Sequence, residues 1–289
     1  MGPTVTPPKS RSARREPATP SRAGRNLPAA IGVGVGLGAV IIGSLVLRKE
    51  LMLAVIVAAI GLGVWELRRA LTRVSIEVPL VPTLVGAVSM LLSAYVGGGE
   101  ALSVTLGLTC VGVLIWRIAD GVAGAVRDVA GGFFVAVYPG FLAGFAALML
   151  AAPDGARRIV VFILVTVLSD VGGYAAGVAF GRHPMAPSVS PKKSWEGFAG
   201  SAVTSAVGGA IAVHFLLDGP WWGGALLGAS AAVAATVGDL AESTIKRDLG
   251  IKDMSNVLPG HGGIMDRLDS LLLVAPLAWA LLAWVVPTT

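Results

Sequence analysis

Charged residues and glycines gather between Ser243 and Asp269, in a chain whose overall charged fraction is only 13%. This segment holds four Lys or Arg, four Asp and one His, and apolar stretches lie on both sides of it. Lys and Arg bind phosphate, Asp carboxylates hold Mg²⁺, and glycines let a backbone approach a polyphosphate. Charges beside membrane helices are costly and usually functional. The segment therefore predicts a phosphate-and-metal site at a membrane surface.

Four aspartates lie within or at the ends of expected helices. Asp170 lies inside one helix and Asp239 ends another, while Asp266 and Asp269 begin a third, three residues apart and so on one helical face. Each carboxylate there needs a basic partner or a cation. We expect Asp239 and Asp266 to be metal ligands, with Asp269 and Asp170 supporting them. The alternative is structural ion pairing with Lys246, Arg247 or Arg267.

The segment 181–197, GRHPMAPSVSPKKSWEG, contains three prolines that keep it extended. Lys192, Lys193 and Ser194 then stand at the N-terminal edge of the next helix, where free N–H groups and the helix dipole favour an anion. We expect the two lysines, with Lys246 and Arg247, to bind substrate phosphates. A purely topological or lipid-facing role for the lysine pair is the alternative.

The sequence Pro259–Gly263, PGHGG, is typical of a tight turn with exposed amides. Gly262 and Gly263 would leave those amides open to a phosphate. His261 could contact a phosphate or a leaving group, or it could be structural.

The composition indicates an all-α, polytopic integral membrane protein. Hydrophobic residues make up 55% of the 289, mean hydropathy is +0.79, and apolar runs long enough to cross a bilayer recur. Backbone groups in lipid must be satisfied within their own segment, which favours helices. We expect about nine spans, near residues 28–47, 51–67, 78–96, 101–119, 129–152, 158–180, 198–217, 221–240 and 264–286. The fifth is interrupted by Tyr138-Pro139-Gly140 and could be kinked or divided.

Charge asymmetry predicts the orientation of these spans. With the N-terminus in the cytoplasm, 18 of the 22 Lys and Arg fall on the inner side. Loops 181–197 and 241–267 then share that side. Residues 1–27 form a polar, basic tail that we expect to be disordered, residues 28–157 an N-terminal set of membrane helices, and residues 158–289 a catalytic membrane region. The tail either lies on anionic lipid or has only a role in topology.

The residues between 243 and 269 also carry a family resemblance. They resemble the signature of phosphatidate cytidylyltransferase, the CDP-diacylglycerol synthase family, through Ser243, Ile245, Lys246, Arg247, Lys252, Asp253, Ser255, Leu258, Pro259, His261, Gly262, Gly263, Asp266, Arg267 and Asp269. Upstream, Ser169, Asp170, Tyr174 and Gly177, and the segment SPKKSWEG at 190–197, are similar to the same family. The resemblance covers roughly residues 160–289 closely.

That resemblance implies a reaction between CTP and phosphatidic acid that gives CDP-diacylglycerol and pyrophosphate, with Mg²⁺ alone or with a second cation. It implies catalysis in a cell membrane at a site facing the cytoplasm, no nucleic-acid partner, and a homodimer. We expect Asp239, Asp266, Asp269 and Lys246 to be catalytic. We expect substrates to contact Asp170, Lys192, Lys193, Ser194, Ser243, Arg247, His261, Gly262, Gly263 and Arg267.

Two other functions share part of this chemistry. A CTP-dependent polyprenol or phytol kinase would use similar metal and phosphate contacts but should lack the full pattern around PGHGG. An ion-coupled transporter would use Asp170 and Asp239 as an ion pathway. Against the transporter, the acids cluster at one end beside a basic loop instead of at the midplane of two repeats.

Overall fold

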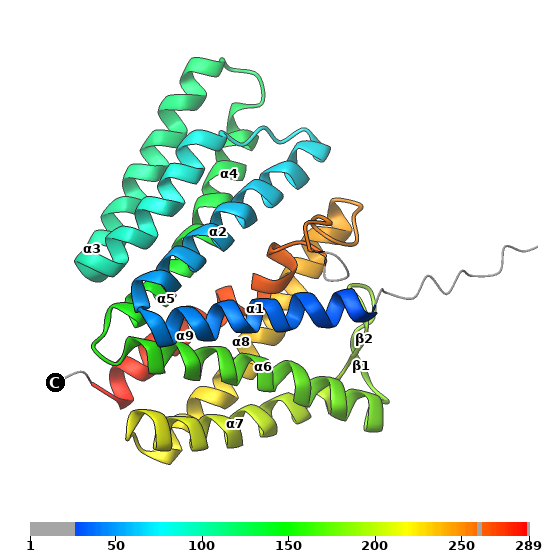
Figure 1. Cartoon of the computed structure of the whole chain (residues 1–289). Coiled ribbons are helices and arrows are strands. Elements are labelled where there is room, and N and C mark those ends of the chain that lie inside the picture. Colours follow the sequence, from blue (N-terminus) through cyan, green and yellow to red (C-terminus); the bar gives the residue numbers. More distant parts are fainter. Residues whose placement is uncertain (1–26, 259–261, 288–289) are drawn as a thin grey trace, which may run out of the picture.

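The computed structural model describes residues 27–258 and 262–287, and it is built almost wholly of helices (Figure 1). Its elements in chain order are α1 (Leu27–Leu47), α2 (Lys49–Leu71), the 3₁₀ turn η1 (Thr72–Val74), α3 (Leu80–Asp120), α4 (Ala125–Val135), the π-helical turn η2 (Ala136–Phe141), α5 (Leu142–Ala151), α6 (Gly155–Phe180), β1 (Pro184–Ala186), β2 (Ser190–Ser194), α7 (Trp195–Leu217), α8 (Trp221–Asp248) and α9 (Met265–Val285). The predicted all-α class is confirmed. The predicted tail and His261 lie outside the described residues, apart from Leu27, which begins α1.

Seven of the helical segments are long and apolar enough to cross a membrane. They are α2 with η1, α3, α4 to α5, α6, α7, α8 and α9. A polytopic membrane protein is therefore what the structure supports. α1 is also apolar, but its part from Gly32 to Leu47 is shorter than these seven.

α3 consists of two helical arms that fold back on each other at a kink. Gly98 has φ 73° and ψ −162°, a conformation open to glycine and strained for other residues. On either side of it, the Thr105 hydroxyl donates to Ser93 Oγ at 2.9 Å. A Cβ on Gly86 would lie 2.2 Å from Thr109 Cγ2, so the two arms pack closely. The arms, 80–97 and 99–120, follow the predicted spans near 78–96 and 101–119 (Figure 1).

The predicted interruption at Tyr138-Pro139-Gly140 is a π-turn inside one continuous helical path. Pro139 has no N–H to give to the helix, and the wider turn of η2 accommodates it. Gly140 is needed for packing, since a Cβ there would lie 2.7 Å from Met90 Cε. The segment is thus one helix with a local change of pitch.

Helices α6, α7, α8 and α9 form the bundle that positions the chemistry-bearing residues. α6 packs extensively on α7, α7 on α8 and α8 on α9. Small residues let the first pair approach: the Ser201 hydroxyl donates to the Ser169 carbonyl at 2.7 Å, and a Cβ on Gly200 would lie 2.3 Å from Ala176 Cβ. Close contact between apolar helices in lipid depends on such small side chains.

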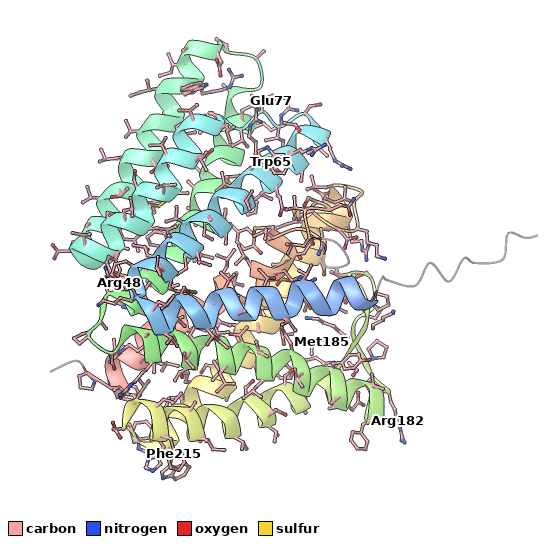
Figure 2. The ribbon with its side chains drawn as sticks, in the orientation of Figure 1. Arg48, Trp65, Glu77, Arg182, Met185 and Phe215 are labelled. Carbon is pink, nitrogen blue, oxygen red and sulfur yellow. The ribbon has the colours of Figure 1, made fainter. Side chains whose placement is uncertain are left out.

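Residues 181–197 form an antiparallel hairpin of β1 and β2, which the sequence analysis did not predict. The three prolines keep the segment extended, as predicted, and extended backbone can pair. The hairpin lies at the end of the bundle where α6 and α8 end and α7 and α9 begin (Figure 1). Arg182 and Met185 are found at this end (Figure 2). The two chemistry-bearing segments therefore lie at the same end of the molecule. The predicted bounds of the second were wrong, because α8 continues to Asp248 and so includes Asp239, Lys246 and Arg247.

Candidate active site

A cavity of about 500 Å³ opens between the hairpin and the ends of α6, α7, α8 and α9. Its walls carry acidic, basic and hydroxyl side chains together with small residues. They are Ser169, Asp170, Gly173, Tyr174, Gly177, Met185, Ser190, Lys192, Lys193, Ser194, Gly197, Phe198, Ser201, Ala235, Thr236, Asp239, Lys246, Asp266, Arg267, Asp269 and Ser270.

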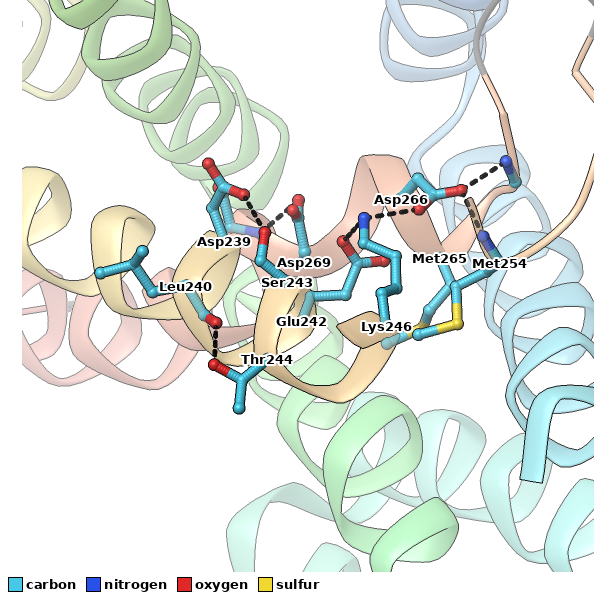
Figure 3. Close-up of polar contacts among 12 residues, drawn as sticks. Asp239, Leu240, Glu242, Ser243, Thr244, Lys246, Met254, Met265, Asp266 and Asp269 are labelled. Atoms are coloured by element: carbon cyan, nitrogen blue, oxygen red, sulfur yellow. Dashed lines mark hydrogen bonds and ion pairs between the residues drawn. The ribbon is translucent and has the colours of Figure 1, made fainter. Parts of the chain in front are cut away.

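Three carboxylates approach the cavity from three helices: Asp170 from α6, Asp239 from α8 and Asp269 from α9. Asp239 and Asp269 lie on either side of Ser243, whose hydroxyl donates to Asp239 Oδ1 at 3.3 Å (Figure 3). Gly238 allows α8 to approach α9 closely enough to bring Asp239 and Asp269 to the same cavity. A Cβ on it would lie 2.5 Å from the Asp269 carbonyl oxygen, so α8 and α9 meet backbone to backbone beside the two aspartates.

Basic side chains also line the wall of the cavity. Lys193 on β2 forms an ion pair with Asp239 Oδ2 at 2.5 Å, and Lys192 beside it is exposed. Ser194 is the N-cap of α7, where its hydroxyl accepts a hydrogen bond from Gly197 N at 3.1 Å. Arg267, exposed on the first turn of α9, completes this wall. The predicted placement of the lysine pair at a helix N-terminus is confirmed.

Deeper in the wall, Lys246 connects two buried carboxylates. Its amine donates to Glu242 Oε2 at 2.5 Å and to Asp266 Oδ1 at 2.8 Å (Figure 3). The Glu242 side chain is 0% exposed and that of Asp266 4%. Among the described residues, Glu242 Oε1 has no hydrogen-bond partner. One lysine therefore serves two buried carboxyl groups beside the cavity.

Asp266 also ties down the loop that precedes α9. Its Oδ2 accepts hydrogen bonds from Met254 N at 3.0 Å and Gly263 N at 2.7 Å (Figure 3). Both oxygens of Asp266 are thus occupied by protein donors. The prediction that Asp266 is a direct metal ligand stays a prediction, and in this arrangement Asp269 is the α9 carboxylate beside Asp239.

Most of the predicted tight turn, residues 259–261, lies outside the described residues, but its two flanking residues are described. Leu258 and Gly262 exchange two backbone hydrogen bonds, at 2.9 and 3.1 Å, and Gly262 has φ +83°. A left-handed conformation of this kind favours glycine. His261 lies outside the described residues, so its predicted role stays a prediction.

The structure brings most of the predicted site residues to one cavity. Those that line it are Asp170, Lys192, Lys193, Ser194, Asp239, Lys246, Asp266, Arg267 and Asp269. The predicted residues that lie outside its lining, within the described part of the chain, are Ser243, Arg247, Gly262 and Gly263. Ser243 still contacts Asp239, whereas Arg247 is exposed on α8.

Two buried carboxylates at this site were missed by the sequence analysis. Glu242 is four residues before Lys246, and that spacing alone could have indicated their ion pair. Glu66, on α2, bonds to the loop before α9 from almost 200 residues away in the chain. Its only local signal is a charged residue near the end of an apolar helix, which is common and unspecific.

The donor chemistry of the cavity fits Mg²⁺. Within residues 27–258 and 262–287, no three His, Cys, Asp or Glu side chains form a ready-made metal site. Mg²⁺ usually binds through one or two carboxylates and completes its coordination with water and substrate phosphates. Asp239 and Asp269, with Asp170 nearby on the wall, offer such a set.

Comparison with known proteins gives a consistent match. A model of the "Cytidylyltransferase family" matches residues 28–285. The chain is 39% identical over 288 residues to a protein of Mycobacterium leprae named phosphatidate cytidylyltransferase, covering 94% of this chain and 92% of that one. A Mycobacterium tuberculosis protein of the same name is 39% identical over 94% of this chain and 88% of its own. A Brucella suis protein, also so named, is 38% identical over 48% of this chain and 53% of its own.

Proposed function

The chain belongs to the cytidylyltransferase family, and we propose that it joins CTP to phosphatidic acid, forming CDP-diacylglycerol and releasing pyrophosphate. Relatives named for this activity match almost the full length of the chain, which supports the assignment. It is a membrane-embedded nucleotidyltransferase of phospholipid biosynthesis. The observation that carries the proposal is one cavity that lysines and an arginine line together with four aspartates from the membrane helices α6, α8 and α9.

In the proposed reaction, a phosphate oxygen of the lipid attacks the α-phosphorus of CTP. A new P–O bond forms, the bond between the α-phosphorus and the bridging oxygen breaks, and pyrophosphate leaves with the electron pair. The attacking phosphate is already ionised, so no general base is needed. The barrier is largely repulsion between anions and their positioning, and Lys192, Lys193 and Arg267 lie where they can lower it.

The proposed cofactor is Mg²⁺, alone or with a second cation. Bound with CTP, it would neutralise charge on the reacting phosphates. Asp239 and Asp269 would hold it, with Asp170 in support. Lys193 pairs with Asp239 in the structure described, and we propose that this lysine turns to a substrate phosphate when the cation takes its place beside the carboxylate.

We propose that the protein crosses the plasma membrane nine times. Its N-terminus and its cavity would both face the cytoplasm. The two arms of α3 count as separate spans, and α1 adds one to the seven long helices. Eighteen of the 22 Lys and Arg then lie inside, which supports this orientation. The homodimer implied by the resemblance is a separate proposal that native mass spectrometry can test.

The test is an assay of purified protein in detergent micelles with labelled CTP. We expect pyrophosphate release only when phosphatidic acid and Mg²⁺ are both present, with CDP-diacylglycerol as the lipid product. Transfer of the γ-phosphate, with CDP as a product, would instead identify a lipid kinase. Uptake of an ion without turnover of CTP would favour the transporter.

A further inference from the structure

Glu66 is a fully buried carboxylate in the membrane helix α2, and its residue is 0% exposed. Its Oε1 accepts hydrogen bonds from the Ser255 hydroxyl at 2.5 Å and from Ile264 N at 3.1 Å. Its Oε2 accepts one from Met265 N at 2.8 Å. None of the ion pairs among the described residues includes Glu66. An unpaired buried anion of this kind is stabilised only by the donors aimed at it.

Two of the three groups that donate to Glu66, Ile264 N and Met265 N, belong to the start of α9. Ile264, the N-cap of that helix, has an apolar side chain and provides no side-chain cap. The first N–H groups of a helix otherwise lack acceptors, and the helix dipole favours a negative charge beside them. A carboxylate from α2 therefore performs the capping that the local sequence does not.

Gly263 is small because this carboxylate occupies the adjacent space. A Cβ on Gly263 would lie 2.6 Å from Glu66 Oε2. One glycine of the PGHGG segment thus serves the approach of Glu66. The sequence analysis had assigned Gly263 to substrate binding, yet it lies outside the cavity lining.

The start of α9, which Glu66 contacts, carries two of the four aspartates that line the cavity. Asp266, Arg267 and Asp269 all lie on the first turns of α9, directly after the two amides that Glu66 accepts from. Ser255 lies in the loop that Asp266 fastens through Met254 N. Glu66 itself does not line the cavity. Its contacts fix the position and rotation of α9 without reaching the substrate.

We propose that Glu66 is a positioning residue for cytidylyl transfer: its carboxylate fastens the α8–α9 loop and the first turn of α9 to α2, and so sets the placement of Asp269 against Asp239. The inference rests on the proposed function above. It assigns a role in catalysis to the N-terminal half of the chain, in which the sequence analysis placed no functional residue.

The activity test uses Glu66→Gln. The glutamine side chain has the same size and keeps one acceptor oxygen, but its NH₂ group would face backbone N–H groups and could not accept their hydrogen bonds. We expect kcat to fall about ten- to hundredfold, the range typical of changes to groups that orient metal ligands, while KM for CTP changes less than about threefold. Glu66→Asp keeps the charge but is one methylene shorter, so it should also lose kcat. A folded Glu66→Gln with wild-type kcat would overturn the proposal.

The matched control is Asp128→Asn, which changes another buried carboxylate, 3% exposed, at the distant α3–α4 corner. Its kcat should stay within about twofold of wild type even where thermal stability falls, because Asp128 does not contact α9. A loss of kcat equal to that of Glu66→Gln would mean that any buried carboxylate change has this effect, and would also overturn the proposal.

A second readout does not depend on turnover. The chain has one cysteine, Cys110, so Cys110→Ser with Asn256→Cys gives a single attachment point for a nitroxide on the exposed loop. We expect Glu66→Gln to raise the mobility of that label in the paramagnetic resonance spectrum and Asp128→Asn to leave it unchanged. If the wild-type enzyme made no CDP-diacylglycerol, the proposed function would fail, and unchanged label mobility would separately remove the role of Glu66 in holding the loop.

Discussion

The α3–α4 corner and the cavity at the ends of α8 and α9 both bury charged side chains, but their charges balance differently. At the corner, Arg117 pairs with Asp128 at 3.1 Å, and both side chains are less than 10% exposed. Arg117 also donates to the Gly121 and Ala123 carbonyls, and Asp128 Oδ1 accepts from Glu77 N at 2.9 Å. Arg127 Nε also lies 3.8 Å from Asp128 Oδ1, so this buried carboxylate has its cations within the protein.

At the cavity several charged side chains lack an ion-pair partner among the described residues. Lys192, Arg267, Asp170 and Asp269 all line it, and none of them takes part in an ion pair there. Lys246 serves both Glu242 and Asp266, and Glu242 keeps an oxygen without a partner among the described residues. Charges that are paired within the protein need nothing from outside, whereas unpaired ones are completed by a cation or a phosphate-bearing ligand. The comparison teaches that pairing within the protein, more than burial, distinguishes a structural ion pair from a binding site.

The largest expected effect comes from neutralising Asp239, the carboxylate that pairs with Lys193. Asp239→Asn should lower kcat by about 10³-fold, as expected when a preorganised electrostatic contact to the reacting phosphates is lost. Its side chain is 39% exposed, so thermal stability should change little. Lipid-dependent pyrophosphate release and a melting curve in detergent measure the two quantities. Activity within tenfold of wild type at normal expression would place the cation elsewhere.

The opposite pattern is expected at the corner. Asp128→Asn leaves the buried Arg117 guanidinium without its counterion, and the free energy of unfolding should fall by about 3 kcal/mol. The kinetic constants of the folded fraction should stay near wild type, since no substrate contact is touched. Denaturant titration in mixed micelles gives the stability. A variant as stable as wild type would show that the corner does not depend on its ion pair.

A smaller effect should follow loss of one basic side chain from the cavity wall. Lys193→Ala removes the partner of Asp239 and one group that lowers repulsion between the two anionic substrates. We expect KM for CTP to rise about tenfold, or kcat to fall by a similar factor, corresponding to ~1.4 kcal/mol. Arg73→Ala is the control, because Arg73 is exposed on η1 and lies outside the cavity lining. Equal kinetics for both variants would leave Lys193 with a role in topology alone.

The smallest effect is expected for the tail. Deleting residues 2–26, which lack apolar anchors, should leave turnover in mixed micelles within about twofold of wild type, because the cavity is built from residues after 168. Membrane association or insertion could change, since six basic residues are removed. A correctly inserted truncation with most of its activity gone would extend the site to the tail.

Hydropathy and residue spacing predicted the features of the fold that are determined within a single segment of the chain. Long apolar runs predicted the helices, and the spans near 78–96 and 101–119 matched the two arms of α3. The interruption at Tyr138-Pro139-Gly140 was recognised, and the Lys192–Ser194 segment was placed at a helix start. The polar residues of two loops were also expected to meet, and they share one cavity. These features depend on burial from water and on local backbone chemistry, which a sequence shows directly.

Contacts between distant helices could not be predicted in this way. The bonds of Glu66 to Ser255, Ile264 and Met265 depend on how α2 packs beside α9, and no local pattern contains that information. The engagement of both Asp266 oxygens depends on the path of the loop before it. Residue type and spacing could not show that protein donors occupy both oxygens of Asp266, three residues before Asp269.

The π-turn of η2 determines which face of the following helix, α5, is turned toward its neighbours. A π-turn contains more residues than an α-turn, and each residue of a helix advances its side chains by roughly 100° around the axis. The face that α5 presents, including Phe145 with its ring centroid 5.4 Å from that of Trp279 on α9, follows this advance. A chain with one residue fewer between Ala136 and Phe141 would keep its hydropathy profile and turn another face toward α9. In η2, the number of residues therefore determines the rotation of α5 about its axis, independently of what those residues are.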